Sequence, residues 1–158
     1  MEGRLSWYFA YGSNMDARRL FADRLAPEGV AAGLRIAGRL DGWRLVFDKR
    51  ARVPAGAGAG NIVVDPQGVV HGTLNLLPAA GFTVLDRYEG VADGHYERRL
   101  VRVRRGDGEG EVDAITYVAL KTADGLRPTR AYLGHLLAGQ DLLPPDYVRW
   151  LAARPTLD

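Results

Sequence analysis

One glutamate in this sequence combines an acid–base side chain with a predicted apolar setting. Phe82, Leu85 and Glu89 fall at i, i+3 and i+7, so they share one face of an expected helix. Glu89 also stands at the C-terminal end of that helix, where the macrodipole disfavours an anion. Burial and the dipole both raise the pKa of a glutamate. A general base working near neutral pH needs a pKa of about 6–7, so Glu89 is the candidate for proton transfer.

Simpler interpretations of the same region are compatible with the sequence. The Glu89 side chain can turn out to solvent, or pair with Arg98 or Arg99, and then it has no chemical role. His95 is no better candidate, because no serine or carboxylate is placed with it as a triad. Tyr96 is most simply the first residue of a strand.

The second stretch whose residues could take part in binding or catalysis is Tyr11-Gly12-Ser13-Asn14-Met15. The residues before it, Leu5 to Ala10, are mostly apolar or aromatic and predict a buried strand that stops at a glycine. Ser13 and Asp16 then have the spacing of a capping box. Beyond them the sequence follows helical spacing, with a stripe made of Ala17, Leu20, Phe21, Arg24 and Leu25.

This pattern of strand, glycine turn and helix N-terminus is suited to holding an anion. A helix N-terminus presents unpaired N–H donors and a partial positive charge, and Gly12 allows the backbone to approach a ligand closely. A carboxylate or a phosphate therefore fits the turn. The same spacing also describes an ordinary N-capped helix, because capping boxes are common.

The remaining segments alternate between predicted strands and helices. Residues 35–49 predict one or two strands, with a turn or bulge at Asp41-Gly42. Pro66-Gln67 predicts a hairpin that joins strands over 61–65 and 68–77. Further patterns predict a helix over 79–89 ending at Gly90, a hairpin of strands 96–104 and 111–120, a helix over 128–138 and a short helix from Pro144.

The glycine-rich residues 54–60 predict a mobile surface loop that could cover a site. Their G-x-G-x-G spacing lacks a following helix, so the dinucleotide fingerprint fails. Sequential hairpins separated by helices indicate an α+β (mixed) fold, a small and largely antiparallel β-barrel flanked by helices. We expect residues 1–158 to form a single domain.

Composition argues against several functional classes. Of the 158 residues, 47% are hydrophobic and 25% charged, as in a soluble globular protein. No apolar run approaches the roughly 20 residues that span a membrane, and no secretory signal is evident, so we expect a cytoplasmic protein. The absence of cysteine and the wide separation of three histidines argue against a metal site. A net charge of +2 is too small to indicate a nucleic-acid-binding surface.

Two segments resemble signature sequences of the gamma-glutamylcyclotransferase family, which has an AIG2-like fold. They are Tyr11-Gly12-Ser13-Asn14-Met15 after an aromatic strand, and Tyr88-Glu89-Gly90-Val91 followed by Gly94-His95-Tyr96. Residues 61–63 with 70–74 are similar to the central hairpin of the family, and residues 128–132 and 143–147 to its C-terminal helices. The resemblance therefore runs in order over almost the whole chain.

The resemblance implies the small mixed barrel of that family and a reaction on a gamma-glutamyl amide or gamma-glutamyl amino acid. The substrate would cyclise to 5-oxoproline and release the amine. By the same likeness Glu89 is the general acid/base, while Tyr11, Gly12, Ser13, Asn14 and Met15 hold the gamma-glutamyl group. Tyr132 matches a tyrosine that lines the substrate site, and Tyr96 is a lesser candidate for the pocket. No metal, cofactor, nucleic acid or membrane partner is implied.

The residues are chemically suited to this reaction, although they leave alternatives open. The substrate carries its own nucleophile, its α-amine, so a base and donors for a developing oxyanion are sufficient. The same pocket also suits an amide hydrolase in which Glu89 activates water. A third possibility is a non-catalytic protein that binds small carboxylates, although a buried Glu89 would weaken such binding. The identity of the leaving amine and the oligomeric state are left open.

Overall fold

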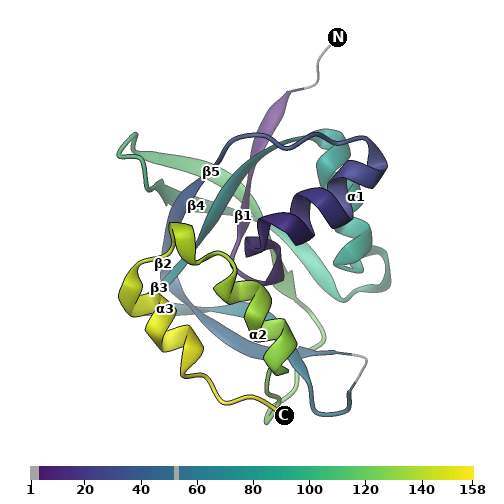
Figure 1. The fold of residues 1–158 in the computed structure, drawn as a ribbon, viewed down its shortest axis with the longest axis vertical. Coiled ribbons are helices and arrows are strands. Elements are labelled where there is room, and N and C mark those ends of the chain that lie inside the picture. Colours follow the sequence, from purple (N-terminus) through teal and green to yellow (C-terminus); the bar gives the residue numbers. More distant parts are fainter. Residues whose placement is uncertain (1–3, 52–53) are drawn as a thin grey trace.

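Five strands close into a barrel in the order β1-β3-β2-β4-β5 (Figure 1). In this computed structural model, which describes residues 4–51 and 54–158, the strands are β1 Leu5–Ala10, β2 Arg35–Arg50, β3 Gly58–Pro78, β4 Tyr96–Arg105 and β5 Glu111–Ala119. Strand β1 pairs in parallel with β5, and the other neighbours are antiparallel. The predicted mixed α+β fold with a largely antiparallel barrel is therefore confirmed.

Alternation of side chains fixes which face of each strand is buried. In β4, Val101 and Val103 point into the core, while Arg102 and Arg104 are exposed. This is the pattern of a sheet with one face in water. In β1 the last residues are buried without alternation, because Phe9 packs inside the barrel while Tyr8 faces α1 and β5 through edge contacts with Phe82 and Tyr117.

The predicted hairpin at Pro66-Gln67 is wrong, because β3 runs through this point without reversing. Both halves of β3 pair with β2, as the partners Leu45–Ile62 and Gly38–Gly72 show. Residues 65–68 bulge opposite Gly42, which lies in the left-handed region at φ +86°, as the sequence suggested for Asp41-Gly42. A proline without an N–H is tolerated in a bulge, where the ladder of hydrogen bonds is already interrupted.

The glycine-rich run is also more ordered than predicted. Residues 54–57 form a turn, but residues 58–60 belong to β3. A Cβ atom at Gly58 would lie 2.0 Å from the Phe47 carbonyl oxygen, so the absence of a side chain lets the two strands come together. The expectation of a surface loop over 54–60 is therefore wrong for its second half.

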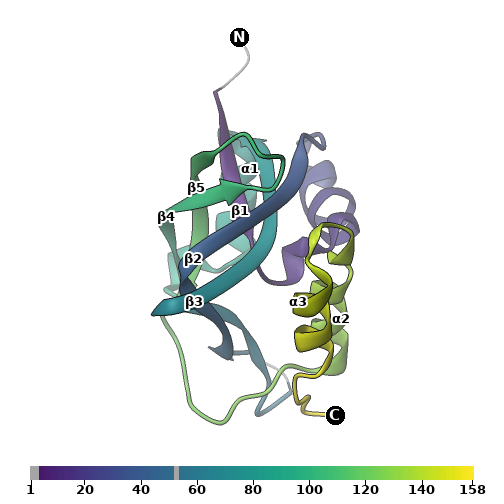
Figure 2. The ribbon, with the colours of Figure 1, turned by 90° about the vertical axis from the view of Figure 1, so that its left-hand side faces the viewer.

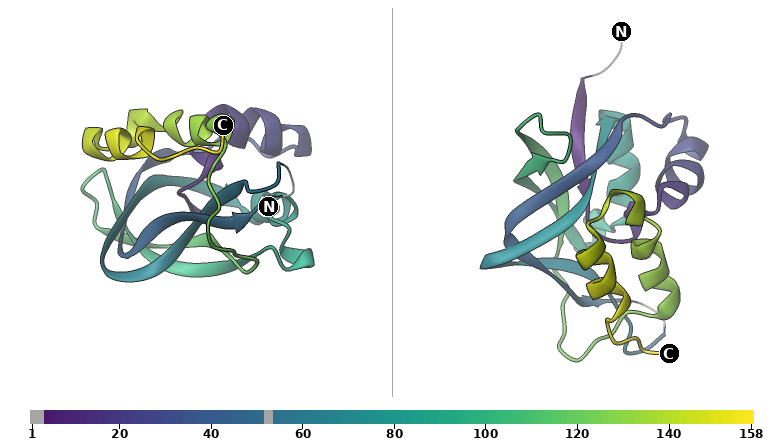
Figure 3. Two further views of the ribbon diagram at one scale, coloured as in Figure 1. Left: turned by 90° about the horizontal axis from the view of Figure 1, so that it is seen from below. Right: turned by 60° about the vertical axis from the view of Figure 1, so that its left-hand side comes forward.

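Helices cover the barrel on two sides. Helix α2 (Arg130–Leu137), α3 (Pro145–Ala152) and a π-helix over Arg18–Leu25 form one layer, seen in Figures 2 and 3, and α1 (Ala79–Tyr88) packs beside the π-helix. As predicted, α1 ends before Gly90, whose φ of +64° is left-handed. No helix in the described part of the chain is both long and apolar enough to cross a membrane.

The start of the first helix differs from the predicted capping box. Ser13–Met15 form a separate 3-10 turn, and the Asp16 carboxylate accepts hydrogen bonds from the N–H groups of Arg18 at 3.1 Å and Arg19 at 3.3 Å. Asp16 alone therefore caps the π-helix, while Ser13 makes no capping bond. The predicted stripe does bury Leu20 and Leu25.

The close contact of β3 with β1 gives a prediction for stability. A Cβ atom at Gly72 would lie 2.3 Å from the Ala10 carbonyl oxygen and 2.9 Å from the Phe9 ring. We expect Gly72→Ala to lower the free energy of unfolding by about 1–3 kcal/mol through overpacking, as measured by urea denaturation. Gly134→Ala, on the open face of α2, is the matched control and should raise stability by about 0.5–1 kcal/mol. Equal effects of the two changes would contradict this assignment.

Candidate active site

A small cavity of about 160 Å³ lies where the end of β1 meets the end of α1 and the middle of the sheet. Seven of the predicted site residues line it: Tyr11, Gly12, Ser13, Asn14, Glu89, Tyr96 and Tyr132. Met15 does not, because its side chain is fully buried and lies against Gly139 at the end of α2. The volume suits a group of amino-acid size, since sites for drug-sized ligands occupy about 300–1,000 Å³.

Glu89 lines the cavity from the C-cap of α1. Its N–H donates to the Leu85 carbonyl at 2.8 Å, so the helix fixes the backbone. Its carboxyl group makes no hydrogen bond to any other residue within 4–51 and 54–158. Burial raises the pKa of Glu89 to about 7, and the charges of Arg24, Arg19 and Lys49 oppose this rise without cancelling it. The group can therefore take up and release a proton near neutral pH.

The alternative in which Glu89 pairs with Arg98 or Arg99 does not match the structure. Arg98 forms a bidentate pair with Asp86, with distances of 2.8 and 2.7 Å. Arg99 lies over the Trp43 ring, with its guanidinium carbon 5.9 Å from the ring centroid. Neither arginine reaches Glu89.

Two tyrosines bind the backbone of Gly60. The Gly60 N–H donates to the Tyr132 hydroxyl at 2.8 Å, and the Tyr96 hydroxyl donates to the Gly60 carbonyl at 2.7 Å. Burial raises the pKa of Tyr132 to about 12 and lifts the pKa of Tyr96 well above its usual value, so both stay neutral. Because Tyr132 accepts from Gly60, its own O–H proton is left to donate toward the cavity.

The backbone of the 12–14 turn supplies further donors. The N–H groups of Gly12, Ser13 and Asn14 have no acceptor within the part of the chain that the structure describes. These N–H groups belong to the short 3-10 turn and not to the N-terminus of the longer helix. The anion site that the sequence predicted at a helix N-terminus therefore lies instead at this turn, whose backbone N–H groups are free. Consecutive free N–H groups lining a cavity are suited to an oxyanion or a carboxylate.

The Asn14 side chain holds this turn in place. Its Nδ2 donates to the Tyr8 hydroxyl at 3.0 Å, and its Oδ1 accepts from Arg24 Nη1 at 3.0 Å. The Arg24 guanidinium also stacks on the Tyr88 ring, 4.5 Å from its centroid. Tyr11 has a similar holding role, since its hydroxyl donates to the Tyr117 carbonyl at 2.5 Å.

Arg19 is a second cation at the cavity, and it is held by a partly buried chain of hydrogen bonds. Arg19 Nη1 lies 3.1 Å from His135 Nε2, and His135 Nδ1 lies 2.9 Å from Asp16 Oδ2. Because an arginine only donates, Nε2 of His135 accepts and its Nδ1–H donates to Asp16. Burial raises the pKa of Asp16, but the bond from His135 and those from backbone amides outweigh it and lower the pKa overall. Arg19 Nε is buried without a partner, which leaves one donor for a ligand.

Sequence reasoning missed Tyr8, Arg19 and Arg24 as lining residues. Arg24 did carry a signal, since it lies on the otherwise apolar stripe of its helix. Arg19 carried none under α-helical spacing, which places residues five apart about 140° away from each other. In the observed π-helix hydrogen bonds run from i to i+5, so Arg19 and Arg24 come to one side.

Comparison with known proteins assigns this chain to a family and its fold to a known class. The AIG2-like family matches residues 69–151, just over half of the chain, and the chain therefore belongs to this family. Among solved structures, a Homo sapiens protein described as uncharacterized superposes with a TM-score of 0.82 at 25% identity, covering 98% of this chain and 90% of that one. No curated protein sequence gives a significant match.

Two further solved structures carry enzyme names. One described as gamma-glutamyl cyclotransferase has a TM-score of 0.80 at 23% identity, with 98% of this chain and 90% of that one covered. A yeast gamma-glutamyl cyclotransferase described as specific to glutathione has a TM-score of 0.63 at 12% identity, with 93% of each chain covered. These likenesses confirm the predicted fold.

The raised pKa of Glu89 gives a prediction about stability that needs no substrate. The unfolded carboxyl loses its proton near its ordinary pKa of 4.5, whereas the folded protein keeps the proton on Glu89 up to pH about 7. This group therefore lowers the stability of the fold progressively between pH 4.5 and 7, and by a constant amount above pH 7. We expect Glu89→Gln to be more stable than the natural chain at pH 8.5, by at most about 3 kcal/mol, and the gain to vanish by pH 4.5.

Chemical unfolding at both pH values tests this difference. Glu97→Gln on β4 is the matched control, because Glu97 is exposed and makes no ion pair within the described residues. It should change stability little at either pH. A Glu89→Gln variant with the same stability offset at pH 4.5 and 8.5 would show that Glu89 titrates normally.

Proposed function

We propose that this protein is a gamma-glutamyl cyclotransferase, which converts a gamma-glutamyl amide or gamma-glutamyl amino acid to 5-oxoproline and releases the amine. The observation that carries the proposal is the Glu89 carboxyl group, with a pKa of about 7, in an amino-acid-sized cavity that also holds free backbone donors. Membership of the AIG2-like family and the fold shared with two gamma-glutamyl cyclotransferases support it.

The proposed chemistry needs one base and a set of donors. Glu89 takes a proton from the substrate ammonium, and the free α-amine attacks the γ-carbonyl carbon of the same molecule. The N–H groups of the 12–14 turn and the Tyr132 hydroxyl stabilise the oxyanion that forms. The C–N bond to the leaving group then breaks as Glu89 returns its proton to the leaving nitrogen. The Glu89 carboxylate takes the second proton from the new ring nitrogen and passes it to the released amine, which departs as an ammonium ion. No residue of the chain forms a covalent intermediate.

Closing a five-membered ring requires the substrate to be bent, and Arg19 is suited to that task. Its buried Nε lacks a partner, and its guanidinium is fixed by His135. A substrate α-carboxylate paired there would be anchored at one end, which leaves the amine free to turn toward the γ-carbonyl. Holding reacting groups of one molecule in such a conformation supplies a large part of a rate enhancement.

A second hollow adjoins the cavity and offers space for the leaving group. It measures about 370 Å³ and shares Ala59, Tyr88, Glu89 and Tyr96 with the first. Its lining holds three cations, Lys49, Arg50 and Arg87, and besides Glu89 one acidic residue, Asp93, so positive charge is in excess. This charge favours a leaving group that carries a carboxylate, such as an amino acid or a dipeptide, over a cationic amine.

Incubation with a panel of gamma-glutamyl compounds tests the proposal directly. The panel contains gamma-glutamyl amino acids, glutathione and gamma-glutamyl derivatives of cationic amines, with 5-oxoproline, glutamate and bound ligand measured in each case. Formation of 5-oxoproline supports cyclisation. Free glutamate would instead identify an amide hydrolase, and a ligand that binds and dissociates unchanged would identify a binding protein.

The strongest kinetic prediction concerns Glu89→Gln. The amide keeps the size of the side chain but cannot accept the ammonium proton, so we expect kcat to fall by about 10²–10⁴-fold. The substrate Kd should stay within about tenfold, because the donors of the turn and Arg19 are unchanged. In the natural enzyme kcat/KM should rise with pH through about 7, where Glu89 loses its proton, and the variant should lack this limb. Full 5-oxoproline formation by a folded variant would refute the role of Glu89.

The turn can be tested through Gly12. A Cβ atom there would lie 3.2 Å from the Tyr132 hydroxyl, so a branched side chain intrudes on the cavity between the free amides and Tyr132. We expect Gly12→Val to raise KM strongly while the protein remains folded by circular dichroism. Gly125→Val is a control at an open surface turn, where it costs some stability but should leave KM unchanged. Normal KM in Gly12→Val would mean that the turn only connects β1 to the helix.

A further inference from the structure

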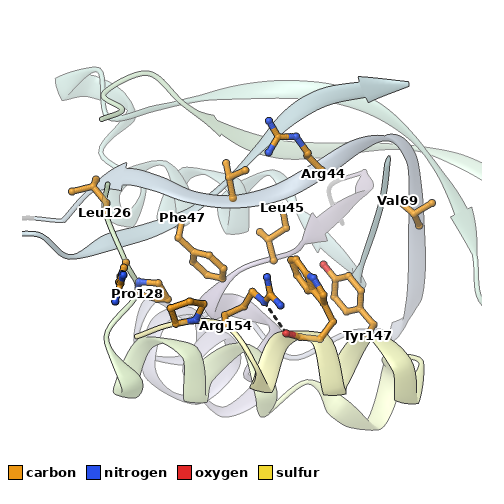
Figure 4. A pocket seen from close by; sticks show the side chains of 12 residues that line it. Arg44, Leu45, Phe47, Val69, Leu126, Pro128, Tyr147 and Arg154 are labelled. Carbon is orange, nitrogen blue, oxygen red and sulfur yellow. Dashed lines mark hydrogen bonds between the residues drawn. The ribbon is translucent and has the colours of Figure 1, made fainter. Parts of the chain in front are cut away.

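A third and larger hollow lies on the outside of the barrel, between β2 and α3. Its volume is about 610 Å³, within the range of small-molecule sites. Figure 4 shows Leu45 and Phe47 pointing from β2 toward the C-terminal helices, with Tyr147 and Arg154 facing them. We call this hollow the β2–α3 groove, and its walls are made by Leu45, Phe47, Val69, Tyr147, Trp150 and Arg154.

The charges of the groove are all of one sign. Arg44, Arg127 and Arg154 line it, and no acidic residue does. Arg44 approaches Asp65 at 3.9 Å and in Figure 4 points away from α3. Arg127 and Arg154 have no carboxylate partner within the described residues. The carboxylate of Asp158, on the neighbouring C-terminal segment, instead accepts from the Arg130 N–H at 2.8 Å.

Arg154 has a fixed orientation among the apolar side chains of the groove. Its Nε donates to the Trp150 carbonyl at 2.9 Å, and its guanidinium stacks 4.3 Å from the centroid of the Trp150 ring. Both Nη groups are left to donate, and they lie between the β2 side chains and α3 in Figure 4. A planar guanidinium in this arrangement matches a carboxylate or sulfonate, and nearby apolar walls strengthen such a pair by excluding water.

We propose that the β2–α3 groove is a binding site for a small organic anion with a flat apolar body, such as an aromatic carboxylate. The body would lie between Phe47 and Leu45 on one side and Trp150 and Tyr147 on the other, with its anionic group on Arg154. Phe47 makes an edge contact with Tyr132, with ring centroids 6.4 Å apart, and Tyr132 lines the Glu89 cavity. The two sites are therefore separated by one aromatic pair and share no lining residue.

Competition experiments on the natural chain test the ligand class. The probe is 1-anilinonaphthalene-8-sulfonate, an aromatic anion whose fluorescence rises in an apolar site. We expect saturable binding of one probe per chain, and at least tenfold weaker binding of N-phenyl-1-naphthylamine, which has the same rings without the charge. Indole-3-acetate should displace the probe, whereas tryptamine, with a cation on the same ring, should not. Equal displacement by both indoles would overturn the proposal.

Matched variants locate the site. Arg154→Gln should weaken probe binding at least tenfold, while Arg149→Gln, which removes the same charge from an exposed pair with Asp146 on α3, should not. Glu89→Gln should leave the affinity for the probe unchanged, because Glu89 does not line the groove. A negative result for the groove would therefore not count against the proposed cyclotransferase function. Equal effects of the two arginine changes would overturn the proposal. Light scattering that shows a stable dimer, with no probe bound, would instead assign the groove to a second copy of the chain.

Discussion

The Gly60 peptide is the point on which the candidate site depends. Its N–H and carbonyl are both taken by tyrosine hydroxyls, from Tyr132 on α2 and Tyr96 on β4. A Cβ atom at Gly60 would lie 3.0 Å from the Tyr132 hydroxyl, and one at Gly12 would lie 3.2 Å from it. Two glycines from distant parts of the chain therefore let a single hydroxyl reach the cavity. The glycine-rich segment acts here as a strand that makes room, and not as a cover.

The electrostatics of the cavity follow from how its cations are held. Three of them surround Glu89, yet its pKa is raised, because burial outweighs their attraction. Each cation is already engaged: Arg24 with Asn14, Arg19 with His135, and Lys49 with the Arg50 carbonyl. The same hydrogen bonds that fix these side chains keep them from forming an ion pair with Glu89. A carboxyl group is thus kept basic within a positively charged cavity, as proton transfer requires.

Sequence patterns predicted the parts of the fold that local rules determine. The alternation in β4, the strand before Gly12 and the helix ending at Gly90 depend on neighbouring residues, and each was recovered. The stripe of Phe82, Leu85 and Glu89 likewise placed the carboxylate correctly at the end of α1. The course of β3 was not recovered, because a turn dipeptide such as Pro66-Gln67 reverses a chain in one context and forms a bulge in another. Only the continuous pairing with β2 decides between them. Arg19 was missed for a related reason, since a π-helix changes which residues share a face.

The residues of the candidate site are spread along the whole chain. The match to the AIG2-like family begins at residue 69, so it includes Glu89, Tyr96 and Tyr132 but not the turn at residues 12–14. The donors of that turn join the rest only because β1 lies next to β3 and β5 in the closed barrel. Tyr132 comes from the helix layer on the outside, and Phe47 contacts it from β2. Closure of the barrel therefore assembles Glu89, the free backbone donors and the tyrosines from segments that no single local motif contains.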